Sequence, residues 1–308
     1  MMSDAENLPT ISVVTPTLNQ AAYLEQTLHS VHDQRYPKLE HIVVDGGSTD
    51  GTVAILERWN ERLTWWVSEP DRGQTHALNK GFAHARGEVW AYLNSDDVYA
   101  ENALWIAGRF FSEHPEVDLL HGRCDILGED GSVQRSHLAR IQSHADALDL
   151  WNIWFQQGQF VQPEVFWRAP AGDATFDESY SYAMEYDYWV RLLREGAAVA
   201  AIEQTLAGFR LTRTQKSRAA AAAAEELLAI VRRELWHKNA TIPRRHRLRG
   251  EWIYSQVLLP AIAASLSDGE SKVTRYLKVL ALCLKHPQLL LSRQLYRRTT
   301  DVIGIPSR

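Results

Sequence analysis

Two adjacent carboxylates, Asp96 and Asp97, are the residues of this chain best suited to chemistry. They close the segment Asn94-Ser95-Asp96-Asp97, directly after the apolar stretch Val89–Leu93. Neighbouring carboxylates repel each other unless water or a cation compensates their charge. Oxygen ligands suit Mg²⁺ or Mn²⁺, and Mg²⁺ commonly combines one or two carboxylates with substrate phosphates. The pair predicts a divalent metal site for a phosphate-bearing substrate, although a plain acidic turn also fits it in isolation.

Two further polar segments follow strand-like stretches earlier in the chain. Asp45 comes after the apolar run 41–44 and before two glycines, which let a ligand approach the backbone closely. A carboxylate here accepts a hydrogen bond from the ring N–H of uracil or thymine, and guanine offers similar donors, so the base stays open. In the loop 69–73, Arg72 is a partner for a base or phosphate, and a helix beginning near Gln74 favours an anion. Ordinary turns remain the alternative for both segments.

The elements that must position these residues alternate between strand and helix. The pattern predicts strands at 11–15, 41–45, 63–68 and 88–93, with helices at about 21–33, from 52, and at 74–85. This order is typical of parallel strands joined by right-handed crossovers, with ligands beyond the carboxyl ends of the strands. Those ends are where the polar segments lie, so the sequence predicts an α/β fold with its site there.

Beyond Asp97 the pattern is looser. It predicts helices at 102–112 and 186–194, the second stopped by Gly196, and strands at 117–126, 161–168 and 198–202. From Gln215 onward the chain is expected to be mainly helical. We therefore predict a catalytic domain over 1–215, with halves of about 1–100 and 101–215, and a helical extension over 216–308.

The composition excludes several classes of protein. The 308 residues are 45% hydrophobic and 23% charged, which is typical of a globular protein. A net charge of -5 argues against nucleic acid as the main partner. Cys124 and Cys283 are the two cysteines, which excludes a disulfide framework and a cysteine-based zinc site.

The C-terminal part is basic. Residues 244–308 hold twelve Lys or Arg and four Asp or Glu, which indicates a solvated tail, a dimer surface or peripheral contact with an anionic membrane. The short polar N-terminus predicts no signal peptide, and the apolar segment 257–266 is too short to span a bilayer. We expect a cytoplasmic protein, with peripheral membrane contact as a hypothesis and an open oligomeric state.

Four segments together resemble the family 2 glycosyltransferases. Residues 11–19 resemble the opening strand and loop of the family, 43–52 its second motif, 69–87 its third, and 92–97 its metal-binding Asp-x-Asp region. They occur in family order within residues 11 to about 215. The resemblance implies the GT-A fold, a mixed, mainly parallel sheet flanked by helices, here with a helical C-terminal extension. It also implies a nucleotide-sugar donor, Mg²⁺ or Mn²⁺, and inversion at the anomeric carbon.

The resemblance also implies roles for residues. By position, the loop 15–19 and Asp45 hold the base and ribose, and Asp96 holds the metal that bridges the diphosphate. Asn94 replaces the first Asp of the triplet, and Asp97 partly compensates for it. The full expected nucleotide-sugar set is Thr15, Pro16, Thr17, Asn19, Asp45, Arg72, Asn79, Ser95, Asp96, Arg213 and Lys216, with Asp96 and Asp97 as metal ligands.

Inverting transfer needs one more carboxylate, which takes the proton of the acceptor hydroxyl. The segment 182–191 resembles the family segment that places this base before a helix, which makes Glu185 the expected base and Asp187 its rival. Arg213 and Lys216 lie in a loop resembling one that closes over the diphosphate. The histidine that many relatives carry near Thr212 is absent, so that loop is expected to supply no third metal ligand. Three aromatic residues are candidates for sugar stacking or for plain packing: Trp151, Trp154 and Phe155.

The predicted function is transfer of one sugar from a UDP- or dTDP-sugar to a glycan or lipid-linked glycan, in synthesis of cell-surface polysaccharide. Two alternatives remain. A metal-dependent nucleotidyltransferase would use Asp45 and Asp96 but leave Glu185 without a role. A non-catalytic nucleotide-sugar-binding scaffold would account for the departures at Asn94 and Glu185. The donor sugar, the acceptor and the linkage depend on loops between about 119 and 183.

Overall fold

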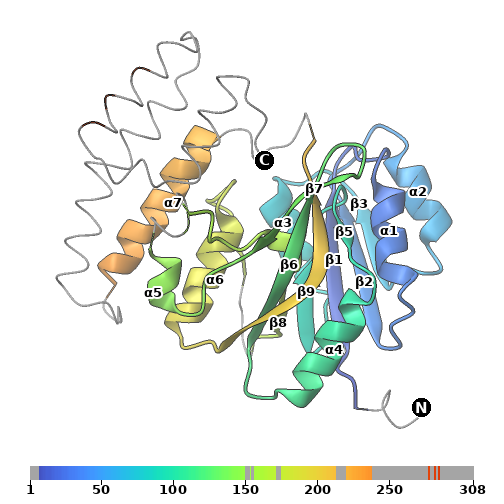
Figure 1. The fold of residues 1–308 in the computed structure, drawn as a ribbon. Helices are drawn as coiled ribbons and strands as arrows, with labels where there is room; N and C mark the ends of the chain where they lie inside the picture. Colours follow the sequence, from blue (N-terminus) through green and yellow to red (C-terminus); the bar gives the residue numbers. More distant parts are fainter. Residues whose placement is uncertain are drawn as a thin grey trace. The chain divides into compact units, whose positions relative to one another are not determined.

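A nine-stranded mixed sheet organises the part of the chain that carries the candidate site (Figure 1). Its order is β3-β2-β1-β4-β8-β6-β9-β5, with β7 paired to β6. The strands are β1 (Ile11–Thr17), β2 (Leu39–Asp45), β3 (Trp65–Ser68), β4 (Val89–Tyr92), β5 (Val98–Tyr99), β6 (Leu119–Leu127), β7 (Val133–Leu138), β8 (Val165–Arg168) and β9 (Val199–Arg210). The helices are α1 (Leu24–His32), α2 (Thr52–Trp59), α3 (Gln74–Phe82), α4 (Ala103–Glu113), α5 (His144–Ala147), α6 (Met184–Arg194) and α7 (Ala220–Leu235).

The structure is a computed structural model that describes residues 7–149, 153, 156–170, 175–212, 220–237, 277, 281 and 284. The chain divides into two compact units, one of residues 1–142 and 160–215, the other of residues 143–159 and 216–308. The first unit holds the whole sheet, and the second holds α5 and α7. Among the described residues, no helix has the length and apolarity required to cross a membrane. The catalytic role predicted for residues 1–215 stays a prediction.

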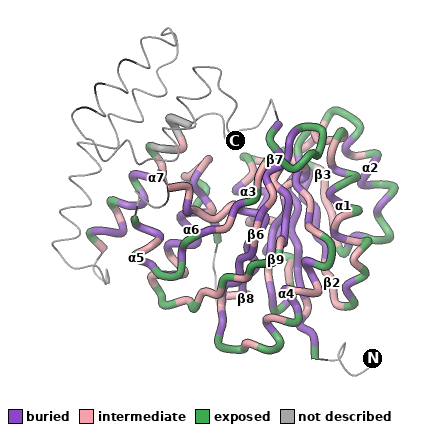
Figure 2. Tube along the Cα trace, in the orientation of Figure 1, coloured by how far each residue is buried: buried purple, intermediate pink, exposed green. Residues whose placement is uncertain are grey.

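The strands β1, β2, β3 and β4 are parallel, as the alternating pattern predicts. In β1 all seven residues are buried, because helices cover both faces of such a strand. Between α1, α2 and β2 lies a small apolar cluster that includes Leu28, Val43 and Leu56. A larger cluster extends under β1, β4, β6 and β8, and Figure 2 shows these central strands as mainly buried. The packing thus fixes the carboxyl ends of β1 to β4 along one edge.

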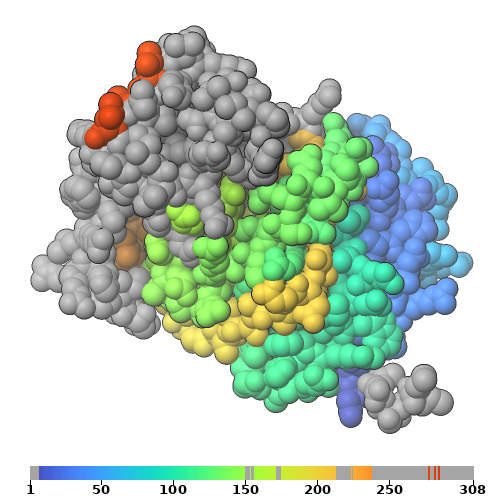
Figure 3. Space-filling model, in the orientation of Figure 1, coloured from blue at the N-terminus to red at the C-terminus, as the bar shows by residue number. Residues whose placement is uncertain are grey.

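The second half of the sheet is mixed. Strand β8 is antiparallel to both β4 and β6, whereas β9 is parallel to β6. The predicted α/β class with a mixed sheet flanked by helices is therefore confirmed. On the face drawn in Figure 3, side chains of β7 (green), β9 (yellow) and α4 (teal) lie at the surface.

Several predicted boundaries are wrong for identifiable reasons. Strand β9 continues to Arg210 instead of ending at Ile202, because β6 and β5 pair with its polar stretch as well. The segment predicted as the start of β8 is a short 3₁₀ helix, η2 (Gln162–Glu164), where Pro163 has no N–H for a strand ladder. The sequence pattern also missed β5 and β7, which are short or exposed.

We predict that Gly81→Ala destabilises the sheet-bearing unit. A Cβ on Gly81 of α3 would overlap Val14 Cγ1 of β1 and lie 3.4 Å from Val44 Cγ2 of β2. Overpacking of a core costs about 1–3 kcal/mol, which exceeds the gain of roughly 1 kcal/mol that alanine brings to a helix interior. Denaturant unfolding measures the difference.

The matched control is Gly51→Ala. Its Cβ would meet only the Ala21 Cβ, at 3.4 Å, and its φ of -78° suits an L-residue. The control should lower the free energy of unfolding by less than Gly81→Ala. An equal effect of the two substitutions would show that close packing of α3 on the sheet is not the constraint at Gly81.

Candidate functional site

The carboxyl ends of β1, β2 and β3 meet in register. Thr17 lies opposite Asp45, and Asp45 lies opposite Ser68. The backbone continues this row, since the Gly46 N–H donates to the Thr17 carbonyl at 2.9 Å and the Leu93 N–H donates to the Val14 carbonyl at 3.0 Å. Residues that are far apart in the sequence therefore share one edge of the sheet, as the strand order predicts.

Asp45 is fully buried and holds its own turn together. Its carboxylate accepts hydrogen bonds from the N–H groups of Gly47 and Ser48, at 3.2 and 2.9 Å, and from the Ser48 hydroxyl. The Ser68 hydroxyl of β3 donates to it at 2.6 Å. These bonds fix the loop after β2, and a base that binds Asp45 would exchange with one of these donors.

The loop after β1 is tied to the same turn. Asn19, in the left-handed region at φ 53°, accepts from the Thr49 N–H at 2.8 Å and donates its own N–H to Ser48 Oγ at 2.7 Å. Thr15 is buried within β1, where its hydroxyl lies 3.0 Å from His41 Nε2. Pro16 and Thr17 are also buried. Of these predicted nucleotide contacts, Asn19 is exposed at the edge of the sheet. Thr15, Pro16 and Thr17 are buried and form the strand end beneath it.

The predicted metal loop follows β4 and is strongly constrained at Asp97. This residue is fully buried, and its carboxylate accepts the Arg210 N–H at 2.8 Å and the Asn94 amide at 3.3 Å. Its carbonyl accepts the Thr27 hydroxyl of α1 at 2.7 Å. Burial, then the charge of Asp96, raise the pKa of Asp97 well above its usual range. Asp97 thus anchors the loop to β9 and α1.

Asp96 is the more accessible member of the pair. Its side chain is half-buried, and burial raises its pKa while the charge of Arg210 opposes this shift. A hydrogen bond from its own backbone N–H to the carboxylate also opposes the shift. Ser95, between Asn94 and Asp96, is buried. Asp96 is therefore the carboxylate of this loop with room for a ligand.

Arg210, the last residue of β9, is a functional residue that sequence reasoning missed. It is 4% exposed, and its guanidinium donates to the carbonyls of Asp96 and Glu129, at 2.9 and 3.3 Å, and to Gln26 Oε1 at 3.0 Å. It also lies over the ring of Tyr23, 5.2 Å from its centroid. The buried guanidinium thus holds the acidic loop in place. The signal in the sequence was that Arg210 directly precedes the segment with Arg213 and Lys216, which is predicted to contact phosphate.

Asn94 joins three segments around the loop. Its amide oxygen accepts from Gln74 of α3 at 2.7 Å, and its nitrogen lies 3.3 Å from Asp97 Oδ2 and 3.2 Å from Gln162 Oε1. Gln162 is fixed in turn because its amide nitrogen donates to the Tyr92 carbonyl. Gln74 is a further member of the site that the sequence pattern did not single out, and Gln162, which resembles part of the family's acceptor-side region, joins it here.

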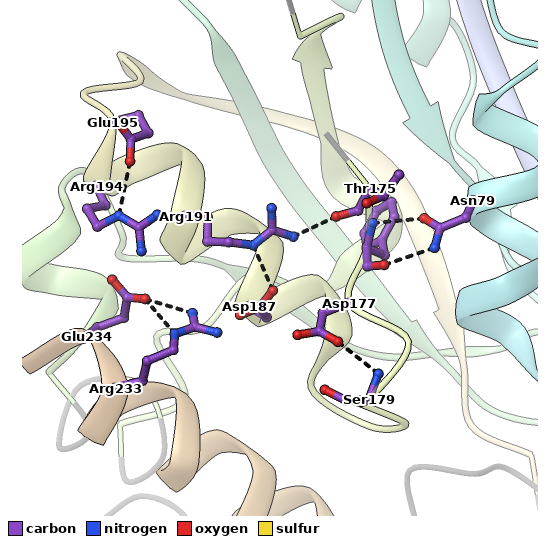
Figure 4. A network of polar contacts seen from close by, with 11 residues as sticks. Asn79, Thr175, Asp177, Ser179, Asp187, Arg191, Arg194, Glu195, Arg233 and Glu234 are labelled. Atoms are coloured by element: carbon purple, nitrogen blue, oxygen red, sulfur yellow. Dashed lines mark hydrogen bonds and ion pairs between the residues drawn. The ribbon is translucent and has the colours of Figure 1, made fainter. Parts of the chain in front are cut away.

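The two candidate bases differ in their surroundings. Asp187 is fully buried, and its carboxylate accepts a bond of 2.8 Å from Arg191, which also donates to the Thr175 carbonyl (Figure 4). Glu185 is half-buried at the start of α6. Its charge and that of Asp97 both add to burial in raising the pKa of Tyr92. The residue before Glu185, Met184, receives the Thr75 hydroxyl of α3 on its sulfur at 2.7 Å, so the start of α6 lies against α3.

Arg72 and Asn79 are engaged with the segment that leads into α6. Arg72 pairs with Glu178 at 2.7 Å, at the surface. Asn79 exchanges two hydrogen bonds with the peptide groups of Phe176. The predicted residues Arg213, Lys216, Trp151, Trp154 and Phe155 lie outside the described part of the chain.

The donor set suits a hard divalent cation that brings other ligands with it. Among the described residues there is no group of three or more His, Cys, Asp or Glu side chains able to hold a metal. Asp96 offers one oxygen-bearing side chain beside a second buried carboxylate, which fits a site completed by substrate phosphates. The residues present therefore fit Mg²⁺ or Mn²⁺ only together with a phosphate ligand.

This chain resembles several solved structures. S. aureus TarS 1–349 in complex with UDP-GlcNAc matches with a TM-score of 0.63 and 19% identity, over 88% of this chain and 79% of that one. The mannosyltransferase PcManGT from Pyrobaculum calidifontis, in complex with GDP-Man and Mn²⁺, matches with a TM-score of 0.62 and 21% identity, over 97% and 86%. The fold is thus that of the GT-A glycosyltransferases.

Two of the relatives that match by sequence are glycosyltransferases. A putative teichuronic acid biosynthesis glycosyltransferase, TuaG of Bacillus subtilis, is 28% identical over 271 residues, covering 84% of this chain and 98% of the relative. An uncharacterised glycosyltransferase of Mycobacterium tuberculosis is 44% identical over 93 residues, 30% of this chain and 36% of its own length. The profile described as glycosyl transferase family 2 matches residues 12–171, slightly more than half of the chain. With its four motifs on one edge of a GT-A sheet, this chain belongs to glycosyl transferase family 2.

Proposed function

We propose that this glycosyltransferase moves a single sugar, with inversion, from a UDP- or dTDP-sugar to a glycan or lipid-linked glycan of the cell surface. One observation carries the proposal: helix α3 contacts both the loop that holds Asp96, through Gln74 on Asn94, and the start of α6 beside Glu185, through Thr75 on Met184. Metal-bound diphosphate on one side and a proton acceptor on the other are what inverting transfer requires. The name of TuaG supports a cell-surface polysaccharide as the product.

The acceptor side rests on Glu185. In the proposed reaction the acceptor hydroxyl attacks the anomeric carbon, the bond to the diphosphate breaks, and Glu185 takes the hydroxyl proton. Asp187 is less suited to this task because its carboxylate is buried and bound to Arg191. We assign to Asp187 the orientation of Arg191 and of the first turn of α6.

The donor side rests on Asp96. Together with the donor diphosphate, Asp96 would hold Mg²⁺ or Mn²⁺, which neutralises charge on the leaving group when bound. Asp97 serves by fixing the loop, since ligation would break its bonds to Arg210 and Asn94. Asp45, Asn19 and the β1 loop are proposed to shape the base and ribose subsite. Phosphate contacts by Arg72, Arg213 and Lys216, and contact of residues 244–308 with a membrane, remain proposals from sequence.

Asp96→Asn is expected to weaken metal-dependent nucleotide binding. Wild-type protein should bind one of UDP, dTDP and GDP more tightly with Mn²⁺ than without it, and the variant should lose at least about tenfold in affinity. Isothermal calorimetry measures both. Glu101→Gln, an exposed acid shortly after the loop, is the control. Folded wild-type protein that binds none of the three nucleotides would contradict the proposal.

Glu185→Gln is expected to separate chemistry from binding. Loss of a general base lowers kcat by about 10²- to 10⁴-fold, while the nucleotide affinity stays within about twofold because no donor contact is removed. Steady-state kinetics and calorimetry on the same preparation measure the two quantities. Glu195→Gln, an exposed acid at the other end of α6, should change neither. Unchanged turnover in Glu185→Gln would remove Glu185 from the reaction.

Asn94→Asp restores the family residue and is nevertheless expected to destabilise the protein. The new carboxylate would face Asp97 Oδ2 and Gln162 Oε1, which now accept the Asn94 amide. An unmatched buried acceptor costs about 1–3 kcal/mol, and protonation of the new acid should shrink this deficit from pH 7 to pH 5. Denaturant unfolding at both pH values tests this.

The control for charge is Asn60→Asp. Asn60 accepts the Trp66 indole N–H at 2.9 Å, a bond that a carboxylate keeps. This variant should lose less stability than Asn94→Asp at pH 7. If the Asn94→Asp protein were stable and bound nucleotide more tightly in the presence of metal, the new carboxylate would be supplying a metal ligand that the wild-type loop lacks.

A further inference from the structure

Helix α3 is bonded to the segment 175–184, which leads into α6 and Glu185. Three residues on the α3 side make these bonds: Arg72 just before the helix, and Thr75 and Asn79 within it. Arg72 and its partner Glu178 are largely at the surface, and exposed ion pairs contribute about 0–1 kcal/mol. The bonds of Thr75 and Asn79 are therefore the ones that can hold the segment.

Asn79 bonds both backbone groups of one residue, Phe176. Its amide nitrogen donates to the Phe176 carbonyl at 2.9 Å, and its amide oxygen accepts the Phe176 N–H at 2.8 Å (Figure 4). The same nitrogen lies 3.5 Å from Glu178 Oε1. The amide is thus used in the pattern of a paired strand, which fixes both the position and the direction of the backbone at Phe176.

Phe176 transmits this fixed position to α6. Its ring is 3% exposed and stacks on Tyr188, with centroids 4.5 Å apart. It also meets the Tyr92 ring edge-on at 5.9 Å, at the end of β4. Tyr188 lies on α6, one turn after Glu185. The ring of Phe176 therefore packs between α6 and the end of β4 and fixes the distance between them.

Thr75 fixes the start of α6 directly. Its hydroxyl lies 3.0 Å from the Tyr180 carbonyl and 2.7 Å from Met184 Sδ. Met184 is the first residue of α6, adjacent to Glu185. Thr75 itself lies beside Gln74, whose side chain donates to Asn94 of the metal loop. One turn of α3 therefore contacts both the donor loop and the first residues of the base-bearing helix.

We infer that Asn79 and Thr75 are positioning residues, which hold Glu185 at the distance from the donor loop that transfer requires. This rests on the proposed function and assigns Asn79 to the acceptor side instead of the nucleotide. A base displaced by about 1 Å costs on the order of a hundredfold in rate without weakening donor binding. The exposed pair between Arg72 and Glu178 has no part in this positioning.

The test compares Asn79→Ala and Thr75→Val with Lys80→Ala, a neighbour on α3 whose side chain pairs with Glu69 instead. Hydrogen–deuterium exchange reports on residues 175–184, calorimetry with UDP, dTDP and GDP plus Mn²⁺ on donor binding, and steady-state assays on kcat. For the first two variants we expect faster exchange in 175–184, nucleotide affinity within about twofold of wild type, and kcat lower by at least about tenfold. Lys80→Ala should match wild type in all three.

The outcomes separate the two hypotheses. Weaker nucleotide binding in Asn79→Ala, by about tenfold or more with unchanged exchange, would make Asn79 a donor contact and overturn the inference. Unchanged exchange with lowered kcat would overturn it as well. Wild-type protein without transfer activity would contradict the proposed function, whereas the exchange comparison would still decide whether Asn79 and Thr75 hold the segment. Thr75→Val keeps the volume of the buried side chain, so it serves if Asn79→Ala does not fold.

Discussion

The site depends on one electrostatic constraint, the placement of two consecutive carboxylates at the buried end of β4. Burial raises the pKa of both Asp96 and Asp97, and the charge of Asp96 raises the pKa of Asp97 further. The chain answers this with different partners for each. Asp97 receives a backbone N–H and an amide, whereas Asp96 has the nearby Arg210 charge and is partly exposed. One acid therefore supports the structure, and in the proposed function the other holds the cation.

Arg210 is the element that makes this division hold. Its backbone N–H binds Asp97, and its guanidinium binds the Asp96 carbonyl, so both acids are fixed by one residue at the end of β9. The long pairing of β9 with β6 brings it there from more than a hundred positions away in the sequence. Strand β9 continues beyond its apolar part to Arg210, and this extension places the Arg210 guanidinium against the acidic loop.

The fold was largely predictable because apolar strands and polar strand ends alternate regularly up to Asp97. Parallel pairing then forces Thr17, Asp45 and Asp96 toward one edge, whatever the side chains do there. The bonding of the site was not predictable in the same way. Asn79 is predicted to contact the nucleotide because residues 69–87 resemble a family motif, and the structure bonds its amide to Phe176, 97 positions later. The sequence does not show that Asn79 and Phe176 lie close together, because their proximity depends on how the second half of the sheet pairs with the first.

The choice between Glu185 and Asp187 shows the same limit at closer range. Both acids lie in the first turn of one helix, and only the burial of Asp187 with Arg191 separates their roles. Helix α3 links this helix to the donor loop, with Gln74 on Asn94 and Thr75 on Met184. The loop after β4 and the start of α6 thus share a support, which in the proposed function relates the position of the base to that of the leaving group.

The most direct test of the account is ³¹P and ¹H NMR of wild-type protein incubated with Mg²⁺ and, in turn, a UDP-, a dTDP- and a GDP-sugar. Inverting transfer predicts that one donor yields the nucleoside diphosphate, slowly with water as the acceptor. The sugar released at early times should have the anomeric configuration opposite to that of the donor. Sugar 1-phosphate as the product, with the nucleoside monophosphate moved to an acceptor, would indicate nucleotidyl transfer instead. Bound but unchanged donors with every sugar would indicate a scaffold that binds nucleotide-sugars without turning them over.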